Sequence, residues 1–147
     1  MNEGPWSRHK IAAFPEEAQI RVRLGCNAST GHPVLVSSWF LPLGDKLWCE
    51  TQQTEHVVSM PTRDPRCAFE VSVETPPCRG VRRPAVASLH DDRGEEILRQ
   101  SIDRNLRGSK SKLAGLLLAG AEHENAIAIA PKKYISWDYS ERMREAI

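Results

Sequence analysis

The chain has 147 residues, with 20 basic and 19 acidic side chains and a formal charge of +1. This length favours one domain with a buried core, expected here to cover residues 1–147. The balanced charge argues against nucleic acid or an anionic membrane as a partner. No apolar run is long enough to cross a bilayer, and the polar start lacks the apolar segment of a secretory signal, so we expect a cytoplasmic protein.

The first 13 residues are polar, and we expect a mobile arm or a short helix there, with Trp6 exposed or packed on a neighbour. From residue 20 onward, apolar and polar side chains alternate with a period of two, which is typical of half-buried strands. Gly44 and Asp45 mark the turn of a hairpin, and Pro84 indicates an edge strand or a bulge. The predicted strands cover residues 20–26, 34–39, 47–51, 67–73, 81–89 and 126–130, with an extension over 134–137.

Helices are predicted mainly in the second half of the chain. Apolar residues spaced four apart predict one helix from about Gly94 to Leu106, with Asp91 or Asp92 at its cap and Gly108 after its end. Shorter helices are expected from the cap Thr54 to Pro61, over 111–119 before Gly120, and over 141–147. Strands joined by turns, with few helices, indicate a mainly β protein: a small antiparallel β-barrel of six or more strands.

No standard catalytic motif is present. The sequence contains no glycine-rich nucleotide loop, no zinc-protease motif and no Gly-x-Ser-x-Gly elbow. The five histidines have no ligand spacing, so we expect no metal site. The four cysteines form no Cys-x-x-Cys pair, and we expect buried, reduced thiols at Cys49 and Cys67. A redox cofactor would explain this pattern, because the cofactor itself carries the reactive chemistry.

Four short motifs follow one another in a recognisable order. A strand ending at Thr51 leads to a short helix with His56, and Arg63-Asp64-Pro65-Arg66 forms a turn. Pro77-Cys78-Arg79-Gly80-Val81 and the ending 136–140 come later. Over residues 18–140 this order resembles the pyridoxamine 5′-phosphate oxidase-like family of FMN-binding split barrels. The resemblance implies an antiparallel split barrel and a homodimer that binds FMN, or a deazaflavin coenzyme, and acts on a small-molecule redox substrate.

The resemblance also implies where FMN would bind. The flavin ring would lie along one strand, and the phosphate would lie beyond the end of the next, near the short helix. Arg79 and Trp137 would lie near the cofactor or the dimer seam, and Arg82 and Arg83 could add charge across that seam. The implied cofactor-binding residues are Val36, Ser37, Ser38, Trp39, Glu50, Thr51, Thr54, His56, Arg79 and Trp137, while catalytic residues stay unknown.

Each of these residues also has an ordinary structural interpretation. Trp39 is equally typical of a barrel core, His56 of a solvated helix, and Trp137 of an anchored tail. Where the family commonly has a second basic residue for the phosphate, this chain has Val57. This difference favours an alternative function, a non-enzymatic split-barrel ligand-binding or sensor protein that has lost tight flavin binding, with no cofactor.

Overall fold

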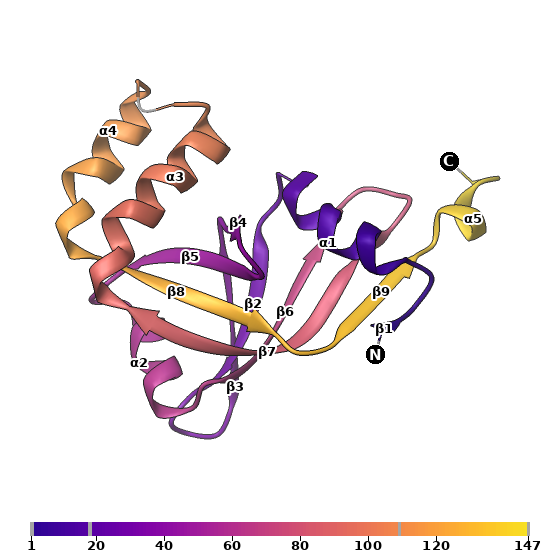
Figure 1. Cartoon of the computed structure of the whole chain (residues 1–147), viewed down its shortest axis with the longest axis horizontal. Helices are drawn as coiled ribbons and strands as arrows, with labels where there is room; N and C mark the ends of the chain where they lie inside the picture. The colour runs from indigo at the N-terminus through magenta and orange to yellow at the C-terminus, as the bar shows by residue number, and fades with distance from the viewer. Residues whose placement is uncertain (1, 18, 109, 147) are drawn as a thin grey trace.

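A computed structural model describes residues 2–17, 19–108 and 110–146. Within these ranges, antiparallel strands wrap into a half-closed barrel with helices around it (Figure 1). The sheet runs in the order β3-β2-β6-β7-β8-β5-β4, and β9 pairs with β7 and with β1. The predicted fold class, a mainly β antiparallel barrel with a few helices, is therefore confirmed.

The elements largely match the predicted ones. In chain order they are β1 (Asn2–Glu3), α1 (Arg8–Glu17), β2 (Val22–Asn27), β3 (Pro33–Ser38), β4 (Leu41–Leu43), β5 (Lys46–Gln52), α2 (His56–Arg63), β6 (Arg66–Ser72), β7 (Arg79–His90), α3 (Gly94–Leu106), α4 (Lys112–Ala119), β8 (Glu124–Pro131), β9 (Tyr134–Asp138) and α5 (Ser140–Met143). The short strand β4 was not predicted separately, and β9 is a strand of its own rather than an extension of β8.

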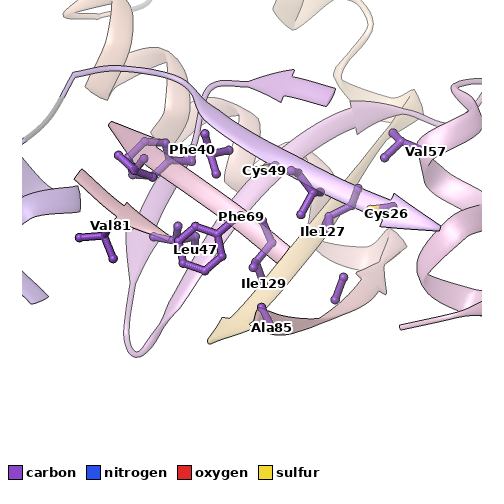
Figure 2. Close-up of a cluster of buried hydrophobic side chains, with 14 of the residues drawn as sticks. Cys26, Phe40, Leu47, Cys49, Val57, Phe69, Val81, Ala85, Ile127 and Ile129 are labelled. Carbon is purple, nitrogen blue, oxygen red and sulfur yellow. The ribbon is translucent and has the colours of Figure 1, made fainter. Parts of the chain in front are cut away.

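The barrel core fills the space between the strands (Figure 2). On β8, Ile127 and Ile129 point into this core, while Ala126 and Ala128 face the other way, against Trp48 and Ile97. The large side chains therefore fill the barrel, and the small alanines let α3 approach its outer surface. The predicted alternation of isoleucine and alanine on two faces is confirmed.

Pro84 lies in a central strand, so of the two predicted alternatives, an edge strand or a bulge, the edge strand is wrong. β7 pairs with β6 on one side, and on its other side first with β9 and then with β8. The Pro84 carbonyl accepts a 2.9 Å hydrogen bond from the backbone N–H of Lys132, in the connection between β8 and β9. In a strand, the N–H and C=O of one residue point to the same side. The missing N–H of Pro84 therefore falls where β7 changes partners, and costs no regular sheet bond.

Pro61 lies inside α2, so the prediction that it ends this helix is wrong. Proline removes one backbone donor, but Val57 and Met60 of the same helix are buried in the barrel core. Packing of this apolar face outweighs the lost hydrogen bond. The N-cap is Glu55 rather than Thr54, and its side chain makes no cap bond.

The other two predicted helix starts differ from each other in how their N-termini are capped. Ser111 caps α4, because its hydroxyl accepts a 3.0 Å hydrogen bond from the backbone N–H of Ala114. Neither Asp91 nor Asp92 caps α3, because a single 3₁₀ turn over these residues precedes it and places Arg93 at the N-cap. The sequence predicted the ends of α3 correctly but not its capping.

The N-terminal segment packs on the barrel. Its second half forms α1, and Trp6 is only 6% exposed, so the expectation of an exposed tryptophan is wrong. The indole Nε1 donates a 2.8 Å hydrogen bond to Asp138, and the ring lies 5.0 Å from that of Phe14, centre to centre. A contact 132 residues away in sequence therefore buries Trp6, which local polarity could not reveal.

All four cysteines are free thiols. Cys26 and Cys49 are buried, and burial raises the pKa of the Cys49 thiol. Cys67 is only partly buried, contrary to the prediction, because it lies near the start of β6, although burial still raises its pKa to about 12. Among the described residues, no helix is both long and apolar enough to span a bilayer.

Candidate functional site

A pocket of about 310 Å³ opens between β3, the end of β5 and α2. We call it the β3–α2 pocket. Five of the ten predicted cofactor-binding residues line it, three from β3 and two from β5. The complete lining is Val34, Val36, Ser37, Ser38, Glu50, Thr51, Glu55, Val57 and Met60. The structure thus brings together two predicted segments that lie 12 residues or more apart in the sequence.

The strands place these side chains for simple reasons. β3 hydrogen-bonds to β2 on one side only, so its other edge is free to border a pocket. Thr51 lies next to the end of β5, opposite Asn125, where the chain leaves the sheet and turns into α2. Val57 and Met60 close the pocket with the apolar face of α2. The resulting lining combines apolar side chains with three hydroxyls and two carboxyl groups.

Four of the predicted residues have described side chains that do not line this pocket. Trp39 is partly buried just beyond the end of β3, and Thr54 is exposed. The side chain of His56 lies outside the described residues, so its predicted role stays a prediction. Arg79 and Trp137 lie on the paired strands β7 and β9, away from α2 (Figure 1).

Trp137 lies beneath a cation on the outside of the sheet. The guanidinium carbon of Arg82 is 4.2 Å from the centre of the Trp137 ring, and the Arg82 Nε is 3.5 Å from Glu70. Arg83 points inward instead, where it is 8% exposed and its Nε donates to the carbonyl of Lys133. Of the two, only Arg82 is available at the surface.

Glu50 is an acidic residue of the β3–α2 pocket whose carboxyl group is strongly affected by burial. Burial raises the pKa of this carboxyl to about 8, although hydrogen bonds, including one of 3.1 Å from the Ser101 hydroxyl, oppose the shift. Glu124 also has a raised pKa because it is buried. One oxygen each of Glu50, Glu124 and Asn125 has no hydrogen-bond partner among the described residues.

Sequence reasoning missed the residues around Glu50. Ser101 comes from α3, and Glu124 and Asn125 come from the start of β8. Gly94 lets α3 begin against β8, since a Cβ there would lie 1.9 Å from the Glu124 carbonyl oxygen. The available signal was the polar Glu124-Asn125 pair directly before an otherwise apolar strand, which is unusual for a buried position.

The turn formed by Arg63 to Arg66 does not line the pocket. It instead connects the end of α2 to β2 and β6 through hydrogen bonds. Asp64 accepts hydrogen bonds from the backbone and guanidinium of Arg66 and from the amide of Asn27. These bonds, first those from Arg66, hold the pKa of Asp64 well below its usual range. The Arg63 guanidinium reaches the Asn27 carbonyl at 3.1 Å. The turn therefore fixes where α2 ends relative to β2 and β6.

Comparison with known proteins identifies the fold. A conserved hypothetical protein of Mycobacterium tuberculosis superposes with a TM-score of 0.79 at 20% identity, covering 94% of this chain and 88% of the other. An F420 reductase superposes with a TM-score of 0.70 at 16% identity, covering 88% of this chain and 97% of the other. A candidate pyridoxamine 5′-phosphate oxidase from Listeria innocua gives 0.64 at 18% identity, covering 86% and 94%.

The chain has the pyridoxamine 5′-phosphate oxidase-like split-barrel fold. No family profile matches the sequence, and no curated protein sequence matches it. At these identities the structural likeness establishes the fold alone. The function of the split barrel has to be argued from its pockets.

The β3–α2 pocket suits one part of a flavin better than the other. Its valines, methionine and hydroxyls fit an uncharged ring system with a polar edge. A phosphate dianion needs fixed positive charge and donors, yet no lysine or arginine lines this pocket among the described side chains, and two carboxylates do. The residues present therefore fit the ring but not the phosphate.

Proposed function

We propose that this split barrel is a homodimeric oxidoreductase-like protein that binds FMN, or a related deazaflavin, through the β3–α2 pocket. The observation that carries the proposal is the convergence of Val36, Ser37, Ser38, Glu50 and Thr51 on one pocket in this fold. The bound flavin would accept or donate a hydride or electrons, and the substrate would be a small redox-active molecule. An F420 reductase among the structural neighbours supports a flavin-type ligand.

A second copy of the chain would supply the missing positive charge. Arg82 is exposed on the outer face of the sheet, next to a shallow cavity of about 340 Å³ that also involves Leu35. Leu35 is 78% exposed, which is unusual for a large apolar side chain in a sheet. Burial of this face in a homodimer of about 2,000 Å² total interface would cover Leu35 and bring Arg82 to a neighbouring site.

One observation favours the alternative function. Without a cation in its described lining, and with Glu50 and Glu55 present, the β3–α2 pocket is better suited to an uncharged ligand than to a phosphate. A split barrel that binds such a ligand without redox chemistry would be a sensor or carrier. The two functions differ in whether a flavin phosphate contributes to binding.

The test is a titration with FMN and with F420, followed by flavin fluorescence, on wild type and three variants. Val57→Lys places an ammonium in the pocket lining, and Val57→Met is its matched uncharged control. One added charge-assisted hydrogen bond is worth about 1.5–3 kcal/mol, so Val57→Lys should bind FMN about 10- to 100-fold more tightly than Val57→Met. His56→Ala should weaken binding.

Two controls complete this experiment. Val57 is buried, so thermal melts must show that each variant stays folded at the titration temperature. Riboflavin, which has the ring without the phosphate, should bind both Val57 variants equally. Absence of saturable binding of either flavin by all four proteins would reject the flavoprotein proposal and favour the sensor function. A monomer by light scattering at micromolar concentration would reject the dimer.

A further inference from the structure

A second and larger pocket lies on the other side of the barrel, between α1 and the paired ends of β7 and β9. We call it the α1–β9 pocket. Its volume is about 740 Å³, and it shares no lining residue with the β3–α2 pocket. In Figure 1, α1 and β9 lie in the right half of the molecule and α2 lies at its lower left. The lining is Trp6, His9, Lys10, Ala13, Phe14, Glu17, Gln19, Ile20, Val73, Arg79, Asp138 and Ser140.

The apolar part of this pocket is aromatic and fixed in place. Trp6 is held by a hydrogen bond from its backbone N–H to the Ser136 hydroxyl and one from its Nε1 to Asp138. Its ring packs against Phe14 of α1, and both side chains are buried. Ile20 and Val73 extend the apolar surface. An immobile aromatic floor offers a ligand contact area at little cost in side-chain entropy.

The charged part of the pocket contains side chains of both signs. Arg79, Lys10 and His9 line it together with the carboxylates of Asp138 and Glu17. Asp138 is already satisfied, because it accepts hydrogen bonds from Trp6, from the backbone and hydroxyl of Ser140, and from Lys10 at 3.5 Å. Although burial opposes ionisation, these bonds hold the pKa of Asp138 well below its usual range.

Arg79 has a guanidinium group whose hydrogen-bond donors are available to a ligand. It is partly buried at the start of β7, and among the described residues its guanidinium takes part in no ion pair or side-chain hydrogen bond. Every other arginine on β7 is engaged: Arg82 with Glu70 and Trp137, and Arg83 with Lys133. A planar guanidinium presents paired donors that match a carboxylate, sulfonate or phosphate.

We propose that the α1–β9 pocket binds a small organic anion, with Arg79 pairing to the acidic group and the Trp6–Phe14 surface contacting an aromatic or aliphatic body. This site is separate from the flavin pocket proposed above and does not depend on it. Its ligand is defined by chemistry: one acidic group attached to an apolar skeleton small enough for the cavity.

The test uses two fluorescent probes of nearly the same shape. One is 8-anilinonaphthalene-1-sulfonate, which is anionic, and the other is N-phenyl-1-naphthylamine, which lacks the sulfonate. Wild-type protein should bind the sulfonate at one site per chain and at least about tenfold more tightly than the neutral probe. Arg79→Gln should remove most of that difference without changing the affinity for the neutral probe. Arg99→Gln, which neutralises an exposed arginine paired with Glu95 on α3, is the matched control and should change neither.

Competition with FMN separates this proposal from the previous one. Because the two pockets share no lining residue, saturating FMN should leave the sulfonate bound. Arg79-dependent sulfonate binding without any FMN binding would support the present site and reject the flavin proposal. Equal affinity for both probes, an equal loss in Arg79→Gln and Arg99→Gln, or full displacement of the sulfonate by FMN would overturn the present site.

Discussion

The two pockets of this barrel differ in whether their described lining contains a lysine or an arginine. The β3–α2 pocket combines hydroxyls and apolar side chains with the carboxylates of Glu50 and Glu55. The α1–β9 pocket combines buried aromatic rings with a guanidinium, an ammonium, an imidazole and two carboxylates. The five predicted cofactor-binding residues that meet in the structure therefore lie in one pocket, and the arginine and lysine that an anionic ligand could use lie in the other.

This separation limits what one copy of the chain can bind. A ligand with both a flat ring and a phosphate would find a partner for its ring in the β3–α2 pocket but no described lysine or arginine there for its phosphate. It needs a second copy, or the chain binds two different ligands. The following predictions alter one pocket at a time and ask whether the other one changes.

The largest expected effect comes from removing the tryptophan that anchors α1. Trp6→Ala deletes a buried indole, its tilted ring contact with Phe14 and its hydrogen bond to Asp138. Loss of a buried aromatic side chain costs about 3–5 kcal/mol. Trp6→Phe keeps a ring and loses mainly the hydrogen bond, so it should cost about 1–2 kcal/mol. Urea unfolding measures both values.

The same two variants distinguish the pockets. In the absence of urea, and at a low temperature where both proteins are folded, Trp6→Ala should lose binding of the anionic naphthalene probe. It should keep whatever FMN affinity the wild type has, because Trp6 does not line the β3–α2 pocket. A parallel loss of both ligands would show that the two pockets are coupled through the barrel rather than independent.

The next effect concerns the acidic pocket and depends on pH. The pKa of Glu50 is about 8 in the folded protein and near 4.5 when the chain is unfolded. Between these values the folded state holds a proton that the unfolded state releases. The stability that this proton provides is complete below about pH 4.5 and is lost as pH rises through 8, with a slope of up to about 1.4 kcal/mol per pH unit.

Glu50→Gln removes this titration and keeps a group that can accept the Ser101 hydrogen bond. It should lie within about 1 kcal/mol of wild type at pH 5 and exceed its stability at pH 8 by roughly 2–4 kcal/mol. Some pH dependence should remain, because the pKa of Glu124 is raised as well. Glu95→Gln, which neutralises an exposed carboxylate on α3, is the control. If the free energy of unfolding differed between wild type and Glu50→Gln by the same amount at pH 5 and pH 8, Glu50 would be ionised in the folded protein.

Sequence patterns predicted the parts of this protein that depend on local periodicity. The strands around Val71 and Ile127 followed from alternation, because one face of each strand meets the core. The helix from Gly94 to Leu106 followed from apolar residues at helical spacing, and its bounds are confirmed. The five pocket residues from Val36 to Thr51 followed from a resemblance that rests on the order of motifs over residues 18–140.

The sequence could not predict features set by distant contacts. Trp6 is buried by β9, 130 residues away, and Arg79 faces a pocket whose other wall is α1. Pro61 is tolerated because α2 packs on the core, and Pro84 because β7 changes partners there. In each case tertiary structure outweighs the local preference from which the prediction was made.

The smallest predicted effect tests which contact holds the α1–β9 pocket in shape. Lys10 lies 3.5 Å from Asp138 and 4.6 Å from the centre of the Trp6 ring, but more than half of its side chain is exposed. Exposed ion pairs contribute at most about 1 kcal/mol, and Asp138 keeps its donors from Trp6 and Ser140 when Lys10 is gone. Lys10→Met should therefore cost less than about 1 kcal/mol in urea unfolding.

The difference in stability between Lys10→Met and wild type should vanish near 1 M salt, where the Debye length is about 3 Å. The Trp6→Phe difference should persist there, because a buried hydrogen bond is screened much less. A salt-insensitive cost for Lys10→Met as large as that of Trp6→Phe would instead make Lys10 a structural anchor, and would leave Arg79 to pair with the proposed anion.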